Sequence, residues 1–100
     1  MKEEKIDLEQ DKKDFFDALN ALNELAEAFW DQHEDERACL TEAQIYESAR
    51  KILGTDNEDT LKAMHNYALG LAKTGRNEEA AEILNEYLDL TELYEKKHGK

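Results

Sequence analysis

The sequence predicts an all-α protein of four antiparallel helices, stacked as two helix hairpins. Pro and Val are absent from the 100 residues and Gly occurs only four times, whereas the helix formers Leu, Ala, Glu and Lys are abundant. No window alternates β-branched and polar residues as a strand would. Apolar residues recur instead every three to four positions, which is the helical period.

Composition limits the kind of protein further. One hundred residues fit a single domain, 1–100, and the net charge of −12 disfavours binding to nucleic acid or to anionic membranes. Cys39 stands alone, so the chain cannot form an internal disulfide. Because no apolar run is long enough to span a bilayer and Met1–Lys5 does not begin a signal peptide, we expect a soluble, cytoplasmic protein, neither secreted nor membrane-bound.

The first helix is predicted over residues 8–34, after a frayed segment at 1–7. Its apolar residues follow a heptad, which places them on one face, and no Gly or Pro interrupts them: Leu8, Phe15, Leu22 and Phe29, with Leu19, Leu25 and Ala26 beside them.

The second helix is predicted over residues 41–53. Asp31–Arg37 is very polar and is expected to form a loop, and Thr41 with Gln44 has the spacing of a capping box. Gly54 then supplies the positive φ angle that commonly ends a helix.

The third and fourth helices are predicted over residues 58–74 and 77–97. Asp56 or Asn57 can cap the third helix, Gly75 ends it, and Asn77 is expected to cap the fourth. The fourth helix carries Leu88 beside Tyr87 and Leu93 beside Tyr94, so it has more than one apolar stripe. An exposed stripe would favour a weak homodimer and a covered one a monomer.

A 42-residue echo runs through the chain and indicates a helical repeat. Ala26 aligns with Ala68, and Ala38 aligns with Ala80. The first helices of the two halves agree well under this shift. The second helices agree poorly, since Thr41 aligns with Ile83 and Glu42 with Leu84. Residues 33–40 would need to be helical to keep the register, and the capping box at Thr41 indicates that they are not.

Residues 53–90 resemble a tetratricopeptide repeat, particularly the longer variety of kinesin light chains. The resemblance rests on Leu53-Gly54-Thr55-Asp56-Asn57-Glu58-Asp59-Thr60-Leu61, and on the segment from Asn66-Tyr67-Ala68 through Gly75-Arg76-Asn77-Glu78-Glu79 to Ala80. Asn57-Glu58 stands where the family has His-Pro. More loosely, the resemblance extends over residues 20–97, and it implies a right-handed helical repeat.

The resemblance also implies where a partner would bind, namely on the concave surface formed by the first helix of each pair. The corresponding candidate residues for binding a peptide are Asn23, Glu27, Trp30, Lys62, His65, Asn66, Leu69 and Lys73, with Asn20, Asp31 and Ala72 on the same surface. Asn66 matches the family's peptide-contacting Asn, whereas Glu24 replaces it in the first half. The alternative is that these residues form an ordinary solvated helix face.

Trp30 has two interpretations. Trp is enriched at binding hot spots, so Trp30 could anchor a ligand. More often, a Trp in such a place closes the end of the hydrophobic core next to the polar loop.

No motif indicates catalysis, a metal or a cofactor. The acidic runs at His33–Glu36 and Asp56–Asp59 lack the spaced oxygen ligands and turn glycine of a Ca²⁺ loop, and Cys39 lacks the company of a zinc ligand. The sequence contains no phosphate-binding Gly-rich loop and no nucleophile elbow. We therefore expect a protein that is not an enzyme and has no cofactor.

Two functions remain open from the sequence. The mismatched second helices favour a non-catalytic helical scaffold, of designed or recombined origin and without an evolved ligand. The alternative is a natural adaptor fragment that binds a peptide segment of a partner protein, for which a basic segment suits the acidic surface.

Overall fold

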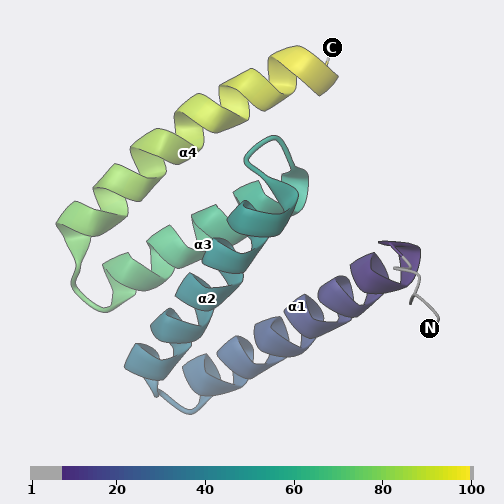
Figure 1. Ribbon diagram of the computed structural model, residues 1–100. Coiled ribbons are helices and arrows are strands. Elements are labelled where there is room, and N and C mark those ends of the chain that lie inside the picture. Colours follow the sequence, from purple (N-terminus) through teal and green to yellow (C-terminus); the bar gives the residue numbers. More distant parts are fainter. Residues whose placement is uncertain (1–7, 100) are drawn as a thin grey trace.

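The structure, a computed structural model, describes residues 8–99 and consists there of four α-helices and no strand. The helices are α1 (Leu8–Asp31), α2 (Asp35–Leu53), α3 (Glu58–Lys73) and α4 (Asn77–His98), as labelled in Figure 1. The frayed segment predicted at residues 1–7 lies outside the described residues. The predicted fold class, four antiparallel helices in two hairpins, is confirmed.

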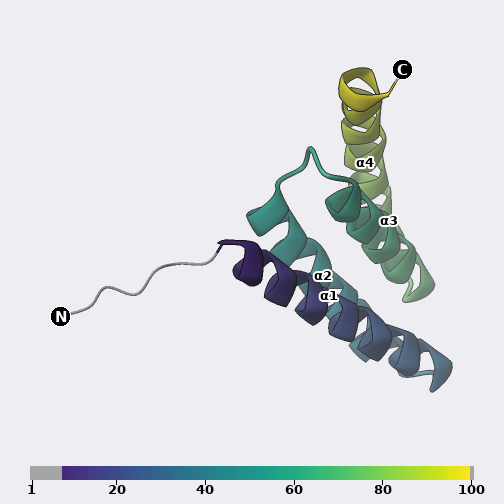
Figure 2. The same ribbon diagram turned by 90° about the vertical axis from the view of Figure 1, so that its right-hand side faces the viewer.

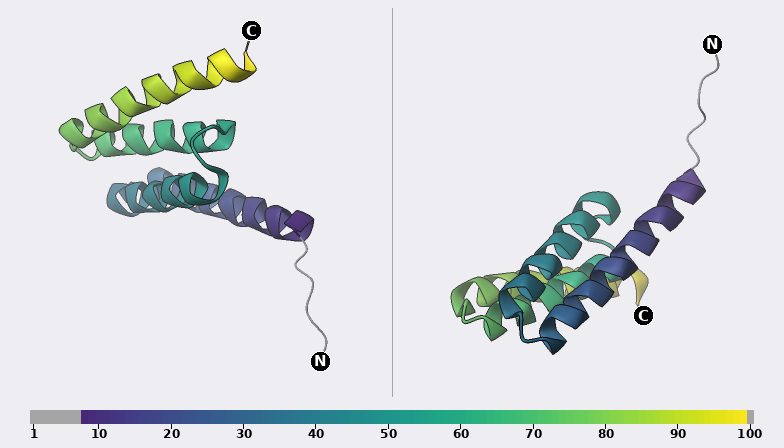
Figure 3. Two further views of the ribbon diagram at one scale, coloured as in Figure 1. Left: turned by 45° about the horizontal axis from the view of Figure 1, so that its top comes forward. Right: turned by 90° about the horizontal axis from the view of Figure 1, so that it is seen from below.

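The helices pack in the order of the chain. α1 packs on α2, α2 on α3 and α3 on α4, whereas the backbones of α1 and α3 do not come close, nor do those of α2 and α4. Figures 2 and 3 show the resulting open stack, with α4 at one edge of the molecule. Each interior helix therefore has two neighbours, and each outer helix has one.

The hydrophobic core lies along the two interior helices. One cluster joins Leu19 of α1 to the α2 residues Ile45 and Tyr46 and to Ala63 and Met64 of α3. A smaller cluster joins Cys39 near the start of α2, Leu71 near the end of α3 and Ala80 near the start of α4. Ala38, Ala49 and Ala68 are completely buried, because small side chains let adjacent helices approach closely.

The predicted start of the second helix was wrong. α2 begins at Asp35, six residues before the expected capping box, and Thr41 is a buried residue in its second turn. The Thr41 hydroxyl donates a hydrogen bond to the Arg37 carbonyl at 2.8 Å, within the helix. The loop shrinks to a tight turn at His33, whose φ of 62° is the only positive value among the described non-glycine residues.

The longer α2 restores the 42-residue register. Ala38 is inside the helix and fully buried, and its counterpart Ala80 is only 4% exposed. The second helices therefore keep the 42-residue register in the structure. The predicted loss of that register, which favoured the designed-origin hypothesis, is not present.

The two remaining helix starts also differ from each other. Asn57 caps α3, because its side chain accepts a hydrogen bond from the Asp59 backbone N–H at 2.8 Å. The predicted cap at Asn77 was wrong, since Asn77 is the first residue of α4 and no described side chain caps that helix. Gly54 and Gly75 end α2 and α3 with φ angles of 83° and 86°, as predicted.

Candidate functional site

A groove runs between α1 and α3, over a floor formed by α2; we call it the α1–α3 groove. It exists because α1 and α3 both pack on α2 while their backbones stay apart. Two adjoining cavities occupy it, of about 190 and 440 Å³, which share Asn23, Lys62 and Asn66. The larger cavity lies near the α1–α2 turn and is lined by Asn23, Ala26, Glu27, Trp30, Glu42, Lys62, Asn66, Leu69, Gly70 and Lys73.

Seven of the eight predicted site residues line this larger cavity: Asn23, Glu27, Trp30, Lys62, Asn66, Leu69 and Lys73. They come from α1 and α3, which are far apart in sequence and which the 42-residue repeat places on the two sides of the groove. Most are exposed, and Leu69 retains 43% of its surface as an apolar patch beside the polar groups.

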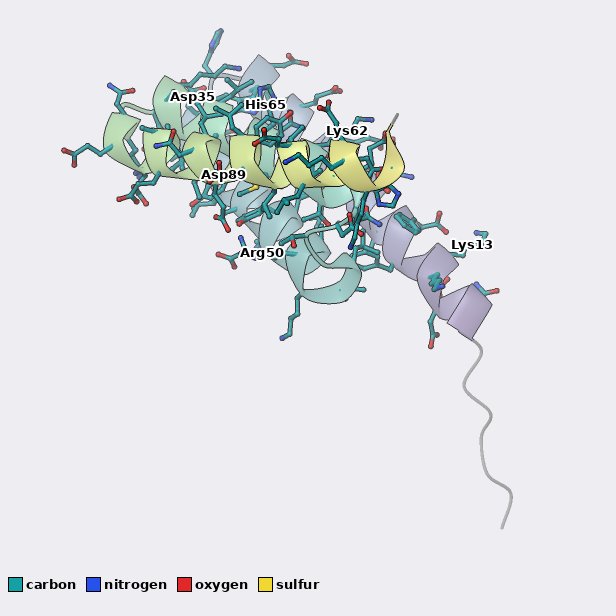
Figure 4. All side chains as sticks on the ribbon, turned by 90° about the horizontal axis from the view of Figure 1, so that it is seen from above. Lys13, Asp35, Arg50, Lys62, His65 and Asp89 are labelled. Atoms are coloured by element: carbon teal, nitrogen blue, oxygen red, sulfur yellow. The ribbon has the colours of Figure 1, made fainter. Side chains whose placement is uncertain are left out.

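His65, the eighth predicted residue, lies elsewhere. Its ring contacts Tyr87 of α4, with the two centroids 5.1 Å apart, and it lines a different cavity, between α3 and α4. In Figure 4, Lys62 and His65 are labelled on the same side of α4. His65 therefore lies outside the larger cavity of the α1–α3 groove, whereas Lys62 and Asn66 line both that cavity and the one between α3 and α4.

Trp30 forms the end wall of the α1–α3 groove. Its indole N–H donates a hydrogen bond to Glu42 Oε2 at 3.0 Å, and the Lys73 ammonium lies 4.5 Å from the centroid of its ring. Trp30 is half-buried, so it is neither a core residue nor a free surface anchor. These contacts hold the indole in one orientation across α1, α2 and α3.

Glu42 lines the candidate site and is the residue there that sequence reasoning missed. Its carboxylate is half-buried, and Oε1 is enclosed without a hydrogen-bond partner in the described part of the chain. Burial raises the pKa of Glu42 above its ordinary value, while the Trp30 hydrogen bond and the positive charge of Lys73 oppose that rise. The carboxylate therefore ties α2 to Trp30 at a cost in desolvation.

Gly70 makes room for this arrangement. A Cβ atom at Gly70 would overlap Glu42 Oε1 and would lie 3.3 Å from Trp30 Cζ2. Gly costs roughly 1 kcal/mol relative to Ala inside a helix, so its place in α3 is explained by this close approach. A glycine within a strongly helical pattern was the one sequence signal that could have pointed to a contact here.

The groove presents amides and a near balance of charge. Asn20, Asn23 and Asn66 are exposed along its length, and each side-chain amide can both donate and accept hydrogen bonds. The carboxylates of Asp59, Glu27 and Glu42 are set against the ammonium groups of Lys62 and Lys73. Such a lining suits the alternating N–H and C=O groups of a peptide backbone better than it suits a single strong charge.

The other candidate chemistry is not assembled. Cys39 is buried, and burial raises the pKa of its thiol above the ordinary value, although Thr74 and Arg76 oppose this. Residues 8–99 hold no cluster of three or more potential His, Cys, Asp or Glu metal ligands. Over the same range, no helix combines the length and apolar character needed to cross a membrane.

Comparison with known proteins agrees with the geometry. A family model, tetratricopeptide repeat, matches residues 17–92, which include most of α1, all of α2 and α3, and most of α4. No match was found among curated proteins or among solved structures. Since the matched region is more than half of the chain and contains both helix hairpins, this protein belongs to the tetratricopeptide repeat family.

Proposed function

We propose that this protein is an interaction module that binds an extended peptide segment of a partner protein in the α1–α3 groove. The observation that carries the proposal is the lining of this groove, where three exposed Asn side chains lead to the fixed indole of Trp30. Tetratricopeptide repeats are helical interaction scaffolds and are generally non-catalytic, which agrees with this function.

The dimensions of the groove set the length of the ligand. Phe16 and Trp30 mark its two ends on α1, and at 1.5 Å per residue they are about 21 Å apart. An extended chain rises about 3.3 Å per residue, so roughly six ligand residues would fill the groove.

Charge favours one kind of ligand over another. The groove itself is nearly balanced, but the whole chain carries −12. Long-range attraction therefore favours segments with basic residues, whose association should weaken as salt screens the charges. Leu69 offers a contact for one apolar side chain at the Trp30 end.

The alternative is a helical scaffold with no ligand of its own, of designed or recombined origin. It would leave the groove as an ordinary solvated surface between two first helices of the repeat. This alternative predicts no saturable binding of any peptide in a library.

A library of ten-residue peptides, half of it biased toward Lys and Arg, tests the proposal by fluorescence anisotropy. We expect saturable binding that weakens by about tenfold or more when Asn20 and Asn23 are both changed to Ala, because each amide contributes about 1 kcal/mol in hydrogen bonds. Both residues are exposed, so the double variant should keep its fold.

Asn85→Ala is the matched control, since Asn85 is an exposed asparagine on α4, outside the groove. It should leave binding unchanged. Binding that no groove variant affects, or the absence of saturable binding across the library, would favour the scaffold alternative.

A further inference from the structure

Within residues 8–99, no helix covers the outer face of α4 as α3 covers that of its counterpart α2. Six residues of α2 are buried, whereas Ala80 alone is buried among those of α4. Tyr46 of α2 is 7% exposed, but Leu88, which follows it by 42 residues, is 61% exposed. Figure 3 shows α4 at the edge of the stack, and α3 is the only described helix that packs on it.

The α2–α3 contact shows what would cover such a face. Tyr67 of α3 stacks on Tyr46 with ring centroids 5.7 Å apart. The Thr60 hydroxyl donates a hydrogen bond to the Ala49 carbonyl at 3.2 Å. Gly70 and Ala63 allow close approach on either side of Tyr67. α3 thus docks through one large ring between small residues.

The α3–α4 groove repeats the smaller cavity of the α1–α3 groove, except that no described helix forms its second wall. In the smaller cavity of the α1–α3 groove, α1 and α2 supply five residues and α3 closes the side with Asp59, Lys62, Ala63 and Asn66. All five have a counterpart 42 residues later in a cavity of about 260 Å³ between α3 and α4: Phe16 and Glu58, Leu19 and Leu61, Asn20 and Lys62, Asn23 and His65, Ile45 and Tyr87.

The Thr91 hydroxyl is a second sign that the described residues leave this surface uncovered. Thr91 lines the α3–α4 groove. It is the counterpart of Ala49, whose carbonyl accepts a hydrogen bond from Thr60 of the following helix. Its Oγ1 is enclosed and has no hydrogen-bond partner in the described part of the chain. A repeat unit of this kind buries only one face and relies on a neighbour to cover the other.

We propose that the α3–α4 groove and the adjoining Leu88 face of α4 dock an amphipathic helix of a partner protein, in the place that a following first helix would take. This surface adjoins the α1–α3 groove, because Lys62 and Asn66 line both, but its α4 residues lie outside that groove and the proposal does not rest on peptide binding there. By analogy with α3, the partner helix carries one large apolar residue between small ones, at the spacing of Thr60, Ala63, Tyr67 and Gly70.

Charge decides which helix fits best. Beside Leu88, α4 exposes acidic side chains along most of its length, while Lys62 and His65 face the groove from α3. Asp89, labelled in Figure 4, is one of these acids; the others are Glu78, Glu82, Glu92 and Glu95. The partner helix therefore has Lys or Arg along the edge that faces α4.

A second copy of this chain fits less well. Its α1 has the right pattern of sizes, with Ala18, Ala21, Leu25 and Ala28 at the corresponding positions. However, Asp17, Glu24 and Asp31 flank that stripe, and they would meet the acids of α4. Like charges facing each other across an interface oppose association, and each copy already carries −12.

The probe is a synthetic helical peptide of 16 residues, the length of α3, titrated into the protein and followed by fluorescence anisotropy. It carries Ala at the positions of Thr60, Ala63 and Gly70, Leu at that of Tyr67, and Lys along both flanks. We expect saturable binding to the full chain, with a Kd that rises about tenfold or more in Leu88→Glu.

Leu93→Glu is the matched control. Leu93 is 59% exposed but lies beside Leu90 and Thr55, away from the α3–α4 groove, so its Kd should stay unchanged. A peptide with Glu in place of each flanking Lys should bind about tenfold more weakly or worse. Both variants change exposed side chains, and circular dichroism checks that each keeps its helices.

Three results would overturn the proposal. One is the absence of saturable binding, and another is an equal loss of affinity in Leu88→Glu and Leu93→Glu. The third is a dimer seen by sedimentation that Leu88→Glu abolishes, because a second copy would then occupy the surface.

Discussion

At the scale of single residues, Glu42 gives the molecule a distinctive pH dependence. Burial raises its folded-state pKa, so the folded protein holds the Glu42 proton more tightly than the unfolded chain does. The stabilisation from the protonated form is complete below the unfolded pKa of about 4.3, and it is lost as the pH rises through the folded pKa. Glu42→Gln, which cannot ionise and keeps an acceptor for Trp30, should lack this loss.

Urea unfolding of both proteins between pH 4 and 7.5 measures the effect. The stability of Glu42→Gln relative to the wild type should increase as pH rises, and then level off. Glu42→Ala is the control, and it should be less stable at every pH by about 1–3 kcal/mol, because it leaves the half-buried indole N–H of Trp30 without its acceptor. Parallel pH curves for wild type and Glu42→Gln would contradict the assigned pKa direction.

Gly70→Ala tests whether the glycine is there for Glu42. The new Cβ overlaps Glu42 Oε1, which can move because it is the end of a flexible side chain, and this breaks the Trp30 hydrogen bond. The roughly 1 kcal/mol gained in helix propensity should then be largely cancelled. In a Glu42→Ala background the same substitution should stabilise the protein by about 1 kcal/mol, and a double-mutant cycle measured by urea unfolding tests this coupling between Gly70 and Glu42.

Equal effects of Gly70→Ala in the two backgrounds would mean that Glu42 and Gly70 are not coupled.

The contact between Glu42 and Trp30 could not be predicted from the sequence. Trp30 and Lys73 could be placed on one surface by the repeat, but Glu42 lies on a second helix whose predicted start was wrong. Its contact with Trp30 depends on the depth of the groove, which no local pattern encodes.

At the scale of elements, the two asparagines near helix starts give a matched pair. Asn57 accepts the Asp59 N–H as the cap of α3, whereas Asn77 lies inside the first turn of α4 and caps nothing. Asn57→Ala should therefore lower the free energy of unfolding by about 1 kcal/mol. Asn77→Ala should change it by less than about 0.5 kcal/mol, as is usual for an exposed site without special contacts. Thermal or urea unfolding of both variants checks the contrast, which equal losses would contradict.

The start of α2 shows why a good local signal can fail. Thr41 and Gln44 have capping-box spacing, but Ala38 and Cys39 ahead of them bury almost all of their surface against the neighbouring helices. That packing is lost if the helix begins at Thr41, and the Thr41 hydroxyl finds an acceptor at Arg37 inside the helix instead. Tertiary burial thus outweighs a cap contributing about 1 kcal/mol. The 42-residue echo contained this information, since it placed Ala38 opposite Ala80.

At the scale of the whole molecule, the four helices and their pairing followed from helical periodicity, Gly54, Gly75 and the repeat. The line of predicted residues along the α1–α3 groove also followed, because a repeat places equivalent positions of α1 and α3 on the two sides of one groove. The position of His65 did not, since its side chain turns toward Tyr87 of α4. Side-chain direction at the edge of a helix face depends on which neighbour packs there.

The open stack predicts an uneven stability across the chain. Contacts connect only successive helices, and most buried residues belong to α2 and α3. The second half of α4, from Leu88 onward, has no buried residue, and its ion pairs with Asp56 are exposed. Exposed pairs contribute little, so this half-helix should open without unfolding the interior helices.

Native-state hydrogen exchange measures this directly. Amides in the middle of α2 and α3 should exchange only through global unfolding, while those after Leu88 should open at a free energy lower by about 2 kcal/mol or more. Ala49→Gly, at a fully buried site in α2, should lower the protection of the interior helices and leave that of the end of α4 almost unchanged. Uniform protection from α1 to α4 would instead mean that the four helices unfold as one unit, as in a bundle where every helix contacts a common core. A helix docked on Leu88 should raise protection selectively in α4, because a ligand stabilises only the openings that release it.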